Sequence, residues 1–105
     1  MEKKIVWSKR SETNLENIFD FIAKDSLIYS TRFVTKLVEY TEQELKHYPE
    51  IGRKVPEFKN TSLDFLREII FKGYRIIYQP HTTHEQLTII SVINGRMSIF
   101  KSMGI

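Results

Sequence analysis

The sequence contains no cysteine among its 105 residues. This absence excludes a disulfide framework and any reaction that uses a protein thiolate. No apolar run approaches the roughly 20 residues that a membrane-spanning helix needs, and segment 1–10 lacks the apolar stretch of a signal peptide. We therefore expect a cytoplasmic protein. Because 41% of the residues are apolar, the chain is expected to fold, as a single domain over residues 1–105.

Signatures of cofactor and metal chemistry are also missing. No P-loop, dinucleotide fingerprint or G-x-S-x-G nucleophile motif occurs. His81 and His84 lie in a connection that also contains Pro80, and no third metal ligand is evident near them. His47 falls near the C-terminal end of a predicted helix. We expect it to make a favourable contact with the helix dipole there and not to act as a general base. The sequence therefore predicts no cofactor and no metal.

The net charge of +3 is unevenly distributed along the chain. Residues 1–10 carry four bases and one acid, and residues 11–52 carry four bases and eight acids. Residues 53–105 carry eight bases and four acids. This asymmetry indicates a basic, partner-facing surface in the second half, although ordinary solvated charge would give the same pattern.

Local patterns predict one strand, two helices and then three strands. The first helix can be capped by Ser8 or Ser11, and Ser11 is the better electrostatic cap because Lys9 and Arg10 would oppose the dipole of a helix that starts earlier. A tight connection between the helices predicts an antiparallel helical hairpin. The result is an α+β fold with helices on one face of a mainly antiparallel sheet, whose last three strands form a meander. The predicted segments are a strand at 4–7, helices at 11–24 and 26–48, a loop at 51–63, a β-hairpin at 66–80 and a strand at 86–93.

The β-hairpin turns at Lys72-Gly73, and side-chain alternation then defines its two faces. The more aromatic face is predicted to lie under the helices, and it contains Arg67, Ile69, Phe71, Tyr74, Ile76 and Tyr78. The opposite face contains Leu66, Glu68, Ile70, Arg75, Ile77 and Gln79. On this second face Arg75 lies diagonal to Glu68. As a surface cross-strand ion pair, the two side chains would contribute less than about 1 kcal/mol.

The whole chain resembles small bacterial toxins of the RelE/ParE superfamily. The resemblance is carried, in order, by IVWS, LENIFDFIAKDS, RFV, HYPEIGRKVPEF, LREIIFKGYRIIYQ and ISVINGR. It implies a toxin of a type II toxin–antitoxin (plasmid stabilisation) system, neutralised by a cognate antitoxin with which it could form a hetero-oligomer. It does not identify the antitoxin-binding residues.

RelE-like members of the superfamily are ribonucleases that cut messenger RNA on the ribosome. Two arginines of the RelE pattern correspond to residues of this sequence. One matches Arg75, directly after the Gly-Tyr of the turn, and the other matches Arg96, after the last strand. Two lysines of that pattern fall on Leu66 and Glu68, and its proton-transferring tyrosine falls near Phe100, which cannot transfer a proton. A ribonuclease built on this chain would therefore depend on Arg75 and Arg96, with Arg67 or Lys72.

ParE-like members instead inhibit DNA gyrase by binding. The GRKVPE segment and the closing V-x-N-G-R segment resemble ParE more than RelE. We therefore expect a non-enzymatic gyrase inhibitor, with a ribosome-dependent ribonuclease or a decayed toxin that binds only its antitoxin as the alternatives. The target-binding surface is expected at Arg75 and in an exposed tail after the Asn94-Gly95 turn, although Ile99 and Phe100 could simply cover the sheet. The tail residues proposed to bind are Arg96, Met97, Ile99, Phe100 and Lys101.

Overall fold

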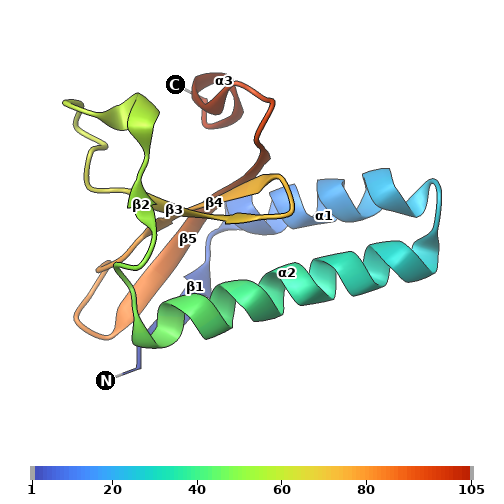
Figure 1. The fold of residues 1–105 in the computed structure, drawn as a ribbon, viewed down its shortest axis with the longest axis horizontal. Coiled ribbons are helices and arrows are strands. Elements are labelled where there is room, and N and C mark those ends of the chain that lie inside the picture. Colours follow the sequence, from blue (N-terminus) through green and yellow to red (C-terminus); the bar gives the residue numbers. More distant parts are fainter. Residues whose placement is uncertain (1, 105) are drawn as a thin grey trace.

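A computed structural model describes residues 2–104. The chain folds into a five-stranded sheet with the strand order β1-β5-β4-β3-β2, and a helical hairpin packs against one of its faces (Figure 1). The predicted α+β class and helical hairpin are confirmed. The elements are β1 (Lys4–Trp7), α1 (Lys9–Ala23), α2 (Leu27–His47), β2 (Arg53–Lys54), the 3-10 helix η1 (Pro56–Phe58), β3 (Arg67–Phe71), β4 (Tyr74–Gln79), β5 (Gln86–Asn94) and α3 (Ile99–Ser102).

The first helix begins earlier than predicted. Ser8 is its N-cap and accepts a hydrogen bond from the Ser11 backbone N–H at 3.1 Å, whereas the Ser11 hydroxyl is buried and donates to the Ser8 carbonyl. The preference for Ser11 was wrong because the earlier start adds three residues to the helix and still places a serine at the N-cap, where its hydrogen bond is worth about 1 kcal/mol. That gain offsets the unfavourable position of the basic residues at the helix start, where each dipole contact is worth about 0.3–1 kcal/mol.

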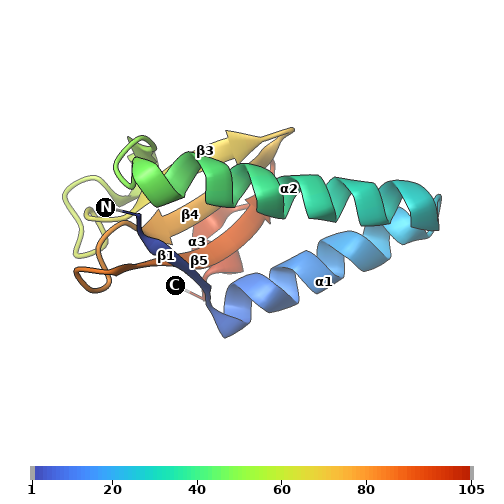
Figure 2. The same ribbon diagram turned by 90° about the horizontal axis from the view of Figure 1, so that it is seen from below.

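The second helix follows its sequence signals. Ser26 caps it, and it ends at His47, directly before the residue that precedes Pro49. The two helices lie antiparallel and side by side, and their connected ends project beyond the sheet (Figures 1 and 2). No helix in the described part of the chain is long and apolar enough to cross a bilayer.

The sheet is larger than the predicted meander because two short strands join it. β1 pairs in parallel with β5, with Lys4 opposite Gln86, and β2 pairs with the start of β3. The prediction of a loop at 51–63 was wrong, since β2 and η1 lie within it. β2 has only two residues and is fixed by its partner strand, so no local period could reveal it.

The two faces of the sheet bury separate apolar clusters. Beneath the helices, Leu37, Ile76 and Leu87 are among the fully buried residues of the larger cluster. On the other face, segment 55–66 and α3 cover a smaller cluster (Figure 1). The smaller cluster consists of Val55, Phe58, Leu66, Ile77, Ile93, Ile99 and Met103.

Candidate functional site

The β3–β4 hairpin has the predicted register and the predicted faces. Phe71 pairs with Tyr74 across the Lys72-Gly73 turn, and Ile70 pairs with Arg75. Both turn residues have positive φ, 45° at Lys72 and 87° at Gly73, as a two-residue hairpin turn of the I′ type requires.

Glu68 and Arg75 meet on the face away from the helical hairpin, as part of a four-residue ion network. Arg75 Nε donates to Glu68 Oε1 at 2.7 Å, and its two terminal nitrogens donate to the Glu57 carboxylate, each at 2.7 Å. Arg53 Nε donates to the second oxygen of Glu68 at 2.7 Å. The network therefore joins β2, η1, β3 and β4 through two bases and two acids, and it has no net charge.

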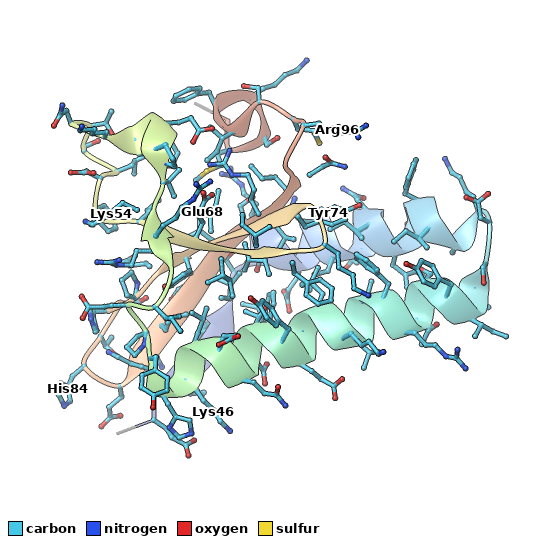
Figure 3. All side chains as sticks on the ribbon, viewed as in Figure 1. Lys46, Lys54, Glu68, Tyr74, His84 and Arg96 are labelled. Carbon is cyan, nitrogen blue, oxygen red and sulfur yellow. The ribbon has the colours of Figure 1, made fainter. Side chains whose placement is uncertain are left out.

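The expectation of a surface ion pair was wrong, because the centre of this network is buried. Glu68 is 1% exposed and Arg75 is 8% exposed. Segment 53–57 crosses this face and reaches the pair through Arg53 and Glu57, and in Figure 3 Glu68 lies beside the β2–η1 segment. A buried carboxylate of this kind depends on its hydrogen-bonded cations, since an unpaired charge inside a protein is very unfavourable.

The bidentate bond between Arg75 and Glu57 is the outer part of the network. Hydrogen bonding to the Arg75 guanidinium lowers the pKa of Glu57 from 4.5 to about 2, and the same bond raises the pKa of Arg75. The Glu57 side chain is 34% exposed, so solvent screens part of this interaction. Above the pair lies an open surface depression of about 340 Å³, with Gly73 and Gly95 among its lining residues.

The positions at which a ribonuclease of this fold would carry its two lysines are closed to solvent. Leu66 belongs to the smaller apolar cluster, and Glu68 is held by Arg53 and Arg75. Arg67 points to the helix side and donates to the Gly52 carbonyl at 2.7 Å. Three N–H donors of Arg75 are occupied by carboxylates. The arrangement thus neutralises a guanidinium where phosphate chemistry would need an accessible cation.

The C-terminal residues divide into a buried and an exposed group. Ser98 caps the short helix α3, and Ile99 and Met103 are buried in the smaller cluster. The expectation of an exposed tail was therefore wrong for these two side chains. Phe100 packs edge-on against Phe58 with a centroid distance of 5.9 Å. Its ring is nonetheless partly exposed, and the other tail residues proposed to bind the target, Arg96, Met97 and Lys101, are exposed as well.

Arg96 and Arg75 have different environments. Arg96 lies on the turn that leads into α3, away from Glu68 (Figure 3). Its backbone N–H is bound by the Asn94 side chain at 2.9 Å, and its own side chain makes no hydrogen bond or ion pair with the described residues. Arg96 is therefore a solvated cation, whereas Arg75 is a buried and paired one.

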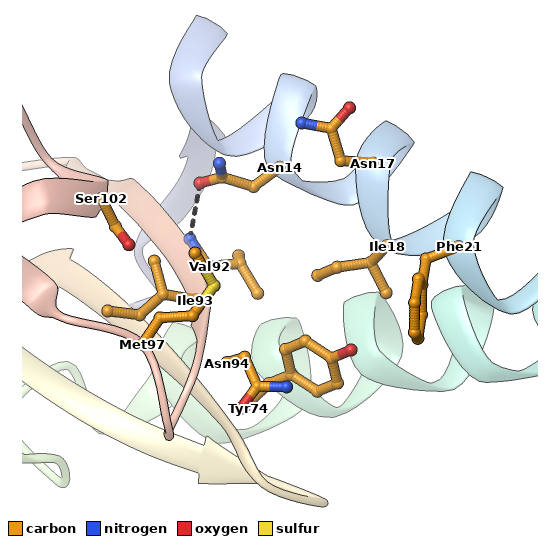
Figure 4. Close-up of a pocket in the computed structure, with 10 residues that line it drawn as sticks. All are labelled: Asn14, Asn17, Ile18, Phe21, Tyr74, Val92, Ile93, Asn94, Met97 and Ser102. Carbon is orange, nitrogen blue, oxygen red and sulfur yellow. Dashed lines mark hydrogen bonds between the residues drawn. The ribbon is translucent and has the colours of Figure 1, made fainter.

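A second feature is an apolar groove between α1 and the ends of β4 and β5, shown in Figure 4. It has a volume of about 360 Å³, and Asn14 anchors its inner wall by accepting hydrogen bonds from Ser91 Oγ and the Val92 backbone N–H, each at 2.9 Å. Ser102 Oγ at its edge is buried and has no hydrogen-bond partner among residues 2–104. The groove is lined by Asn14, Asn17, Ile18, Phe21, Tyr74, Val92, Ile93, Asn94, Met97 and Ser102.

Sequence reasoning missed the two outer members of the ion network. Arg53 and Glu57 were assigned to a loop, and their contacts with Glu68 and Arg75 depend on the path of segment 55–66 across the sheet. No signal within the segment specifies that path. Among residues 2–104 there is also no group of three or more His, Asp or Glu side chains that could hold a metal.

Solved structures share this fold at low sequence identity. A chain of the chromosomal ParDE toxin–antitoxin system from P. aeruginosa has a TM-score of 0.69 at 12% identity, with 89% of this chain and 96% of that chain covered. The toxin–antitoxin complex RelBE2 from Mycobacterium tuberculosis gives 0.66 at 15%, covering 90% and 99%. E. coli toxin RelE, solved as a mutant in the free state, gives 0.61 at 16%, covering 98% and 94%.

The similarity to these structures shows that the chain has the RelE/ParE fold. Sequence comparison identifies the family. The family model of ParE toxins of type II toxin–antitoxin systems (parDE) matches residues 5–99, so the chain belongs to this family. None of the curated proteins is significantly similar to the chain. The predicted superfamily is confirmed.

Proposed function

We propose that this toxin inhibits DNA gyrase by binding to it, without chemistry of its own, and that a cognate antitoxin holds it inactive. The proposal rests on membership of the ParE family together with the state of the sheet face that carries Arg75. The two alternative functions are a ribonuclease and a decayed toxin that binds only its antitoxin, and each predicts a different assay result.

The observation that carries the proposal is the neutralised guanidinium of Arg75. Cleavage of RNA needs cations that face the developing charge on phosphorus and groups that move two protons. Here the Arg75 donors are directed at Glu57 and Glu68, and Leu66, on the same face of the sheet, is buried in an apolar cluster. A phosphate that approached Arg75 would have to displace a bidentate carboxylate. This arrangement favours a toxin that works through its outer surface.

The antitoxin is proposed to occupy the groove between α1 and the ends of β4 and β5. The groove offers apolar contacts from Ile18, Phe21 and Met97, and none of its lining residues is charged. Two bases, Arg96 and Lys101, adjoin lining residues in the chain. An amphipathic segment with acidic residues beside its apolar side chains would complement such a surface.

Two assays with the purified toxin separate the candidate functions. In a supercoiling assay the toxin should inhibit gyrase, and in a programmed-ribosome assay it should leave messenger RNA intact. Cleavage at the ribosomal A site that is abolished by Arg96→Ala would replace the proposal with the ribonuclease. Inactivity in both assays would indicate the decayed toxin.

Co-expression with the product of the adjacent gene tests the partner. We expect a complex that co-purifies at low salt and in which the toxin no longer inhibits gyrase. Phe21→Asp should weaken the complex because it places a charge in the apolar groove, whereas Tyr48→Asp, at an equally exposed position on the far end of α2, should not. Separate elution of the two wild-type proteins would contradict the proposed partnership.

A further inference from the structure

The connected ends of α1 and α2 form an apolar tip that the fold does not bury. Four large apolar side chains within nine residues of sequence are exposed there by 53–67%: Phe21, Leu27, Ile28 and Tyr29. Figures 1 and 2 show this end of the hairpin projecting beyond the sheet, with no other described element beside it. Single exposed apolar residues are common on protein surfaces, but several large ones gathered at one end of a helical hairpin indicate an interaction site.

Folding gives no reason for Leu27 and Ile28 to be apolar. Neither residue belongs to the two buried clusters or to the partly buried side chains that pack against them. They occupy the first two positions of α2, where acidic side chains would stabilise the helix dipole, and the first turn of α2 contains no acid. The helix start thus carries exposed apolar area in place of favourable charge.

The tip is also held in one conformation. Ser26 Oγ accepts a hydrogen bond from the Tyr29 backbone N–H at 3.1 Å, and Ser30 Oγ donates to the Phe19 carbonyl of α1 at 2.6 Å. Both serines are shielded from full exposure. Because the apolar side chains stand on an ordered helix start, little conformational entropy is lost when a partner covers them.

The charge and shape of the tip determine the kind of partner that fits. Residues 20–32 contain two acids, Asp20 and Asp25, and two bases, Lys24 and Arg32, so this segment has no net charge. A polyanion such as DNA or an anionic lipid surface would gain no electrostatic attraction from it. Two tips would also bury too little area against each other for a stable dimer, which needs about 800 Å² from each copy. Four large side chains of about 150–250 Å² each that are exposed by 53–67% offer less area than that. A concave, apolar cleft in a larger protein suits a convex, uncharged projection.

We propose that the hairpin tip is the anchor by which this toxin docks into an apolar cleft of its target, with Leu27 and Ile28 as the central contacts. This inference rests on the proposed inhibition of gyrase and assigns that activity to the tip. The tip borders the antitoxin groove through Phe21, which lines it. A bound antitoxin would therefore lie next to the docking surface and hinder access to it.

A pair of double variants tests the proposal. Leu27→Gln/Ile28→Gln replaces the two apolar side chains by glutamine, which is a good helix former and adds no charge. Tyr48→Gln/Ile51→Gln makes a matched change to exposed apolar residues beyond the opposite end of α2. Gyrase inhibition, antitoxin binding, thermal unfolding and elution volume are measured for both variants and for the wild-type toxin.

We expect the tip variant to need at least about tenfold more protein for half-inhibition, as the loss of central interface contacts predicts. It should bind antitoxin and unfold at the wild-type temperature, and the matched variant should inhibit fully. Equal inhibition by both variants would overturn the tip assignment while leaving gyrase inhibition intact. A wild-type dimer that the tip variant abolishes would assign the patch to self-association instead. If wild-type toxin itself fails to inhibit gyrase, both this assignment and the proposed function fall.

Discussion

Replacement of Arg75 by leucine should destabilise the protein far more than loss of a surface ion pair would. The substitution leaves the Glu68 carboxylate buried and removes its bond from Arg75 Nε. Removing one partner of a buried pair costs about 3–5 kcal/mol. Glu68 retains the 2.7 Å bond from Arg53, whose side chain is 62% exposed, so the lower end of the range applies. We expect the free energy of unfolding to fall by about 3 kcal/mol.

The double variant Arg75→Leu/Glu68→Leu identifies the source of this loss. Replacing both members of a buried pair by apolar side chains is often neutral or stabilising, so most of the lost stability should return. Arg96→Leu is the matched control, because Arg96 is exposed and its side chain is unpaired among the described residues. It should change stability by no more than about 0.5 kcal/mol.

Urea denaturation at pH 7, followed by circular dichroism, gives the free energy of unfolding of the wild type and of the three variants. A domain of this size has a total stability of about 5–15 kcal/mol, so the single variant should remain folded at low urea. A loss below about 1 kcal/mol for Arg75→Leu would match a surface pair and would refute the buried network. Failure of the double variant to recover would show that Arg75 acts through a contact other than Glu68.

Three further changes test other parts of the structure. Gly52→Ala should cost about 1–3 kcal/mol in urea denaturation, because its Cβ would lie 2.6 Å from the hydroxyl of Tyr78, and an unchanged midpoint would contradict this packing. Glu57→Gln should lower stability by about 1 kcal/mol after allowance for solvent screening. Because the pKa of Glu57 is lowered from 4.5 to about 2, the difference from wild type should be full above pH 4.5 and vanish as the pH falls towards 2. Removal of residues 96–105 should lower the melting temperature sharply, because it uncovers the cluster around Ile99, and an unchanged melting temperature would restore the tail as a dispensable, exposed segment.

The sequence was sufficient to predict the β3–β4 hairpin in detail. The period-2 alternation and the Lys72-Gly73 turn fix both the register and the face of every side chain, because a one-residue slip would expose the aromatic face. The helical hairpin was equally accessible, through the tight connection between its helices and the stop at Pro49. These features depend on residues that are close together in the chain.

Features that depend on distant contacts could not be read in the same way. The parallel pairing of β1 with β5 joins residues about 80 positions apart, and nothing in Lys4–Trp7 specifies that edge of the sheet. The burial of Glu68 depends on where segment 55–66 crosses the sheet. The burial of Ile99 depends on the same segment, because Val55 and Phe58 complete the cluster that Ile99 enters. One unpredicted path therefore accounts for errors in both the ion pair and the tail.

The path of segment 55–66 across the sheet also affects how variants of Arg75 are interpreted. Arg75 falls where the resemblance places a functional arginine, so a loss of toxicity in Arg75→Ala would invite the conclusion that it binds the target. In this structure the same variant leaves Glu68 with one cation and frees Glu57 from the sheet. Loss of fold would then produce the same result as loss of a contact.

The stable double variant Arg75→Leu/Glu68→Leu separates the two causes, because it removes the guanidinium while relieving the buried carboxylate. If this protein inhibits gyrase as well as the wild type does, Arg75 holds segment 55–66 in place and has no contact with the target. If it is folded but inactive, the guanidinium itself takes part in binding. We expect full inhibition, since the network directs its donors inward and the exposed apolar surfaces lie elsewhere, at the hairpin tip and along the groove beside α1.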